Sequence, residues 1–148
     1  MANAVAPDIA RLARRLVRAE AQGLDRPDAL VAACERAWER LRRRLIVLIG
    51  PMGCDALFAR ALALARSDHP MLTGVTADTA NGSGLAGVRG RLPEGEPTDV
   101  LAALMAVLVH FLAVLVRLIG ADLVVRVVRE IWSELPPKET DLHEETNE

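Results

Sequence analysis

The most conspicuous residue with chemical potential is His110, the only polar side chain in the apolar run from Val100 to Val116. A histidine in an apolar helical pocket is the usual proximal ligand of haem iron. The chain has no C-x-x-C-H motif and no second well-placed histidine. The sequence therefore predicts a neutral, buried core imidazole with a carbonyl or hydroxyl partner, and an apolar ligand or haem near His110 is the alternative.

The remaining residues capable of catalysis or metal binding are scattered. His69 and His143 lack metal-ligand spacing, and Cys34 and Cys54 are isolated. Structural zinc sites need closely spaced pairs of such residues, and isolated cysteines are typical of small core residues in a reducing compartment. We therefore expect a cytoplasmic, non-enzymatic chain without cofactor or metal.

The segment 82–87 matches the dinucleotide fingerprint G-x-G-x-x-G literally. That fingerprint works only between a strand and a helix, because the pyrophosphate lies at the helix N-terminus. The residues that follow, 88–93, do not favour a helix, since they include Gly90 and Pro93. The prediction is a flexible glycine loop rather than a nucleotide site.

Arginines are concentrated in one short stretch, which forms a basic patch of Arg36, Arg40, Arg42, Arg43 and Arg44. Residues 1–66 carry 12 Arg against 7 acids (+5), whereas residues 67–148 carry 6 Lys or Arg against 13 acids (−7). Trp38 is the single aromatic residue among these arginines, so aromatic residues do not alternate with them, and the whole chain has a net charge of −2. Nucleic acid is therefore an unfavoured partner. An acidic protein surface, or the chain's own tail 139–148, is favoured.

Helical periodicity and breakers define the elements that hold these residues. Apolar residues make up 51% of the chain, mostly Ala, Leu and Val, and aromatic residues only 3%. Such a composition favours helices. The pattern predicts helices over 7–22, 27–49, 51–67 and 98–135, with Asp25 and Thr98 as N-caps and a kink or division at Gly120.

Two regions lack this pattern. Residues 67–97 form a predicted flexible loop, with a weak hairpin (arms 73–79 and 85–92) as the alternative. Residues 136–148 form a predicted disordered acidic tail, so the single domain spans 1–135.

The fold expected is all-α, a compact bundle of about four helices around the apolar helix 98–135. The run Val100–Val116 reaches the lower length limit of a membrane span. Arg117 follows directly, no aromatic belt flanks the run, and three amphipathic helices need an apolar surface to cover. A central buried helix is therefore favoured, and a membrane-associated protein is the alternative.

The last part of that helix carries more apolar residues than three helices would cover. We expect the uncovered stripe to be an interface for a protein partner or a second copy. Its residues would be Leu123, Val127, Ile131 and Trp132, with Trp38 as a further anchor. The alternative is that both tryptophans are ordinary core residues. The preferred function is a non-enzymatic adaptor or structural subunit.

The tripeptide Leu48-Ile49-Gly50 recurs as Leu118-Ile119-Gly120, which we attribute to chance.

Overall fold

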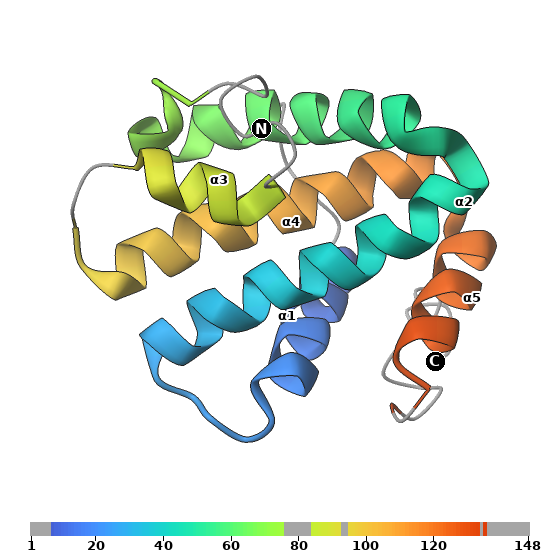
Figure 1. Ribbon diagram of the computed structural model, residues 1–148, viewed down its shortest axis with the longest axis horizontal. Coiled ribbons are helices and arrows are strands. Elements are labelled where there is room, and N and C mark those ends of the chain that lie inside the picture. The colour runs from blue at the N-terminus through green and yellow to red at the C-terminus, as the bar shows by residue number, and fades with distance from the viewer. Residues whose placement is uncertain (1–6, 76–83, 93–94, 134, 136–148) are drawn as a thin grey trace.

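The computed structural model describes residues 7–75, 84–92, 95–133 and 135. The described part is helical throughout and contains no strand, which confirms the predicted all-α bundle (Figure 1). The elements are α1 (Pro7–Ala21), α2 (Pro27–Asp68), the 3-10 helix η1 (Pro70–Leu72), α3 (Gly84–Arg91), α4 (Pro97–Ile119) and α5 (Ala121–Ile131).

Helix α2 is bent sharply at Gly50, whose φ of 81° and ψ of 160° are not helical. This confirms the break predicted at Gly50-Pro51, although the two predicted helices form one kinked element. Because proline removes a backbone donor and glycine accepts positive φ without strain, the chain reverses here with little cost. The two arms of α2 lie on either side of α4 (Figure 1).

Helix α4 is the centre of the bundle, as the apolar run Val100–Val116 predicts. One of its faces is fully covered, mainly by α2, through residues 103, 104, 107, 108, 111, 112 and 115. Helices α2 and α4 are also long and apolar enough to cross a membrane by length and composition. In this arrangement the covered face of α4 supplies much of the hydrophobic core.

The predicted helix 98–135 is divided at Gly120, where φ is 91°. The first part, α4, ends at Ile119, and α5 ends at Ile131 instead of residue 135. The divided helix places α5 beside both α2 and α4. This turn is what brings Trp132 back onto the bundle.

Both predicted N-caps are wrong by one or two residues. The caps are Arg26 instead of Asp25 and Glu96 instead of Thr98, and neither makes a side-chain capping hydrogen bond. Each cap precedes a proline at the first helical position. A residue before proline prefers an extended backbone, so it does not join the helix. Proline has no backbone N–H, and at the first helical position that group would have no partner within the helix, so the proline sets where the helix starts.

The predicted loop 67–97 is partly helical. It contains η1 and α3, so the hairpin arm 85–92 is wrong, and the prediction that no helix follows the glycine motif is wrong as well. Most of the other arm lies outside the described residues, as does the predicted tail 136–148. Contacts of α3 with Trp38 and Glu35 of α2, described below, hold it in a helical form that its own sequence does not favour.

Candidate functional site

A pocket of about 540 Å³ opens along the face of α4 that α2 leaves uncovered. Its base is formed by residues one or four positions apart on that helix, among them Leu101, Ala102, Met105, Ala106 and Val109. Ala102 and Ala106 leave room for the pocket, because a larger side chain at either position would extend into it. The size lies within the range of small-molecule sites, about 300–1,000 Å³.

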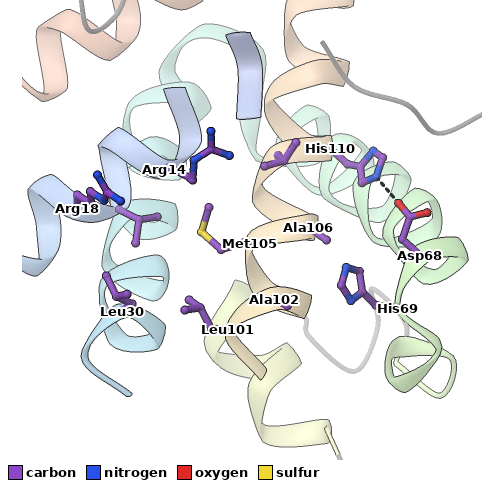
Figure 2. Close-up of a pocket in the computed structure, with 12 residues that line it drawn as sticks. Arg14, Arg18, Leu30, Asp68, His69, Leu101, Ala102, Met105, Ala106 and His110 are labelled. Carbon is purple, nitrogen blue, oxygen red and sulfur yellow. Dashed lines mark hydrogen bonds and ion pairs between the residues drawn. The ribbon is translucent and has the colours of Figure 1, made fainter. Parts of the chain in front are cut away.

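The two walls of this pocket differ in chemistry (Figure 2). On one side α1 contributes Arg14 and Arg18, which are exposed and make no ion pair among the described residues. On the other side the end of α2 contributes Asp68 and His69, and α4 contributes His110. With the histidines neutral, two arginines against one aspartate give the pocket a net positive charge.

His110 is buried, as predicted, with a relative exposure of 4%. Its partner is not a carbonyl or hydroxyl but the carboxylate of Asp68, with 3.4 Å between Nε2 and Oδ2. Asp68 is exposed and can exchange this contact for water or for a ligand. The sequence predicted the burial but not the partner, because Asp68 lies 42 residues earlier at the end of another helix.

The contact with Asp68 also bears on how His110 could bind a metal or haem iron. The described residues contain no group of three or more His, Cys, Asp or Glu that could hold a metal ion. The His110 Nε2 atom is directed to Asp68, so an iron at that atom would have to displace the carboxylate. The pocket offers an apolar base, one imidazole–carboxylate pair, and two guanidinium groups without an ion pair in the part of the chain that the structure describes.

The predicted basic patch is largely neutralised within the chain. Arg36 and Arg40 both pair with Glu20, Arg42 pairs with Asp55 at 3.5 Å, and Arg44 pairs with Glu130. Arg43 alone of the five is exposed without an ion pair among the described residues. The acidic partners thus come from α1, α2 and α5, while the predicted partner segment 139–148 lies outside the described residues.

The predicted interface stripe is not exposed. Trp132, Val127 and Trp38 have exposures of 0%, 2% and 2%, and Leu123 and Ile131 are half-buried. The turn at Gly120 folds α5 against α2 and α4, which a straight helix would not allow. The expectation of an apolar stripe in water is therefore wrong for Val127 and Trp132, and the alternative, that both tryptophans are core residues, is confirmed.

Trp132 closes a polar network that joins three helices. Its Nε1 donates to Glu20 Oε2 at 2.9 Å, and Arg40 Nη1 donates to the same oxygen at 2.5 Å. The Arg40 guanidinium also lies 5.1 Å from the Trp132 ring centroid and donates to the carbonyl of Ile131 at 2.6 Å. This network fixes α5 and has a structural role away from the pocket.

The glycine motif has a structural role as well. In its described part, Gly84–Gly87, the backbone of Gly84 lies against the buried indole of Trp38. That indole contacts Phe58 in a tilted arrangement and Phe111 edge-to-face, with ring centroids 4.8 and 4.7 Å away. A second tie comes from Arg89, whose Nε lies 2.6 Å from Glu35 in an ion pair without hydrogen-bond geometry. These contacts hold α3 over the aromatic cluster.

Both cysteines are buried, as predicted. Burial, with a smaller effect from Glu35, raises the pKa of the Cys34 thiol to about 12. Burial also raises the pKa of Cys54, against an opposing effect of Arg42. A raised pKa keeps a thiol protonated and unreactive. Cys34 instead supports the pocket base, since its Sγ lies 3.4 Å from the Met105 sulfur.

Comparison with protein-family models, with curated proteins and with solved structures finds no match to this chain. The geometry of the pocket is therefore the basis on which its function is argued.

Proposed function

We propose that this chain is a helical binding protein whose α1–α2–α4 pocket takes an amphiphilic small molecule with an anionic group. The observation that carries the proposal is an apolar base beside two arginines, Arg14 and Arg18, that make no ion pair with any described residue. An alkyl chain would lie along α4 between Leu101 and Val109, a distance of about 12 Å at 1.5 Å per residue. A carboxylate or phosphate would meet Arg14 and Arg18, whose guanidinium groups suit such anions.

Binding without turnover fits the residues present. None of the described residues that line the pocket carries a hydroxyl or thiol group, so these residues offer the His110–Asp68 pair no side-chain nucleophile to activate. Asp68 is exposed on the wall opposite the arginines, where it would stay in water or reorient when a ligand enters. In our proposal the pocket therefore senses or carries the amphiphilic molecule and does not convert it.

The proposal is tested by calorimetric titration of the whole chain with dodecanoate and with dodecanol. We expect dodecanoate to bind about tenfold more tightly, because one charge-assisted contact contributes about 1.5–3 kcal/mol and 1.4 kcal/mol is a factor of ten. The double change Arg14→Gln and Arg18→Gln should remove that preference and leave dodecanol binding unchanged. Equal affinity for both compounds in the unchanged chain would contradict the anionic part of the proposal.

The apolar part needs a separate variant. Ala102→Trp places an indole in the pocket from an exposed position of α4, so we expect the fold to persist and both compounds to lose at least tenfold in affinity. Ala63→Trp is the matched control, because Ala63 is exposed on α2 and does not line this pocket. If both variants bind equally well, the pocket is not the binding site.

The adaptor function expected from the sequence stays a prediction. Its proposed anchors Trp38 and Trp132 lie within the bundle, so a protein partner would have to use another surface. No specific contact in the structure favours that function over ligand binding.

A further inference from the structure

Large exposed apolar side chains gather at one end of the bundle. Val47, Leu48, Met52 and Leu118 have exposures of 74%, 46%, 84% and 59%. We call these four residues the apolar tip. Among the described residues, the one other large apolar side chain of comparable exposure is Leu24, which lies in the α1–α2 connection.

The tip exists because two helix breaks lie together. The kink of α2 and the division between α4 and α5 are at the same end of the molecule (Figure 1). The repeated tripeptide Leu-Ile-Gly supplies both: Ile49 and Ile119 pack partly on the core, while Leu48 and Leu118 before them are exposed. Sequence alone does not reveal that the two breaks lie together, since the two tripeptides are 70 residues apart.

Unpaired positive charge borders the tip. Arg43 lines one surface hollow together with Val47, and Arg117 is adjacent to Leu118. Both arginines are exposed and make no ion pair among the described residues. Their neighbours Arg42 and Arg44 are already paired with Asp55 and Glu130. The edge of the tip therefore offers cations to an outside partner.

We propose that the apolar tip docks onto a lipid bilayer that carries anionic headgroups. Exposed Leu, Val and Met would enter the headgroup–acyl boundary, and Arg43 and Arg117 would contact lipid phosphates, the combination that interfacial membrane binding uses. Helix α4 stays in the bundle, because its covered face forms the core. The proposal is independent of the ligand pocket.

A second copy of the chain fits this surface less well. A two-fold interface places the same patch against itself, so the unpaired arginines of both copies would lie close together. Four side chains are also far fewer than the roughly 20–30 residues that each partner contributes to a standard stable interface. An anionic membrane would bury the apolar side chains of the tip and would also supply phosphates for its arginines.

Sedimentation of the whole chain with vesicles tests the proposal. One vesicle sample contains phosphatidylcholine alone, and the other contains phosphatidylcholine with phosphatidylserine. We expect at least tenfold more protein to bind the second sample, and added salt to lower this binding. Equal binding to both samples, or binding to neither, would overturn the proposal.

Two variants probe the two parts of the tip. The double change Val47→Ser and Met52→Ser should lower vesicle binding at least tenfold, and so should the double change Arg43→Gln and Arg117→Gln. Leu24→Ser and Arg60→Gln are the matched controls, since both residues are exposed away from the tip and Arg60 has no ion pair among the described residues. Loss of binding in the controls as well would overturn the assignment to the tip.

Two further results separate this proposal from its alternatives. Ala102→Trp should leave vesicle binding unchanged; if it removes binding, the pocket rather than the tip holds lipid. Light scattering in the absence of vesicles should give the same mass for the unchanged chain and the tip variants. A dimer that the serine changes dissociate would assign the tip to self-association instead.

Discussion

Gly84→Ala should lower the free energy of unfolding by about 3 kcal/mol, the sum expected from a left-handed alanine and from overpacking. Gly84 has a φ of +54°, and an added Cβ would lie 1.9 Å from Nε1 and 2.3 Å from Cδ1 of Trp38. Trp38 has no free space to move into, because it is buried between Phe58 and Phe111. Either the aromatic cluster shifts or α3 leaves it.

Urea unfolding followed by circular dichroism measures this effect. Gly90→Ala is the control: it lies in the same helix, has nothing within 4 Å of an added Cβ, and should be neutral or stabilising by up to about 1 kcal/mol. Equal stabilities of the two variants would show that α3 does not depend on the close approach of Gly84 to Trp38.

Glu20→Ala should have the second large effect, a loss of about 3 kcal/mol. The Glu20 carboxylate, whose side chain is 9% exposed, accepts hydrogen bonds from Arg40 and from the fully buried Trp132. Removing it leaves the indole N–H without its acceptor and the Arg40 charge without its ion pair. Loss of one partner of a buried pair costs about 3–5 kcal/mol, and the partial exposure of Arg40 favours the lower end.

Glu39→Ala is the matched control for this network. Glu39 is exposed on α2 and has no ion pair among the described residues, so its removal should change stability by less than about 0.5 kcal/mol. Thermal unfolding with tryptophan fluorescence reports the stability together with the surroundings of Trp38 and Trp132. A Glu20→Ala variant as stable as the control would mean that α5 is held by its apolar contacts alone.

The sequence was sufficient for the long helices and for the positions of their breaks. Glycine and proline act locally, so the kink at Gly50 and the division at Gly120 could be predicted from neighbouring residues. The helix α3 could not, because its stability depends on Trp38 and Glu35, which lie about fifty residues earlier in the chain.

The pocket could not be predicted from the sequence, because α4 is apolar on all of its faces. An apolar helix shows no periodicity, so its core face and its pocket face look alike in sequence. The alanines Ala102 and Ala106 resemble ordinary helix formers, and only the placement of α1 shows that nothing covers them. Burial of His110 was predictable from its apolar neighbours, whereas its pairing with Asp68 required the fold of α2 around α4.

The most direct test of ligand binding in the pocket is photolabelling with a diazirine-bearing fatty acid, followed by peptide mapping. We expect the label within Leu101–His110 and on α1 near Arg14 and Arg18, and competition by excess dodecanoate. Label concentrated at Val47–Met52 and Leu118, or spread over the surface without competition, would contradict the pocket as the binding site.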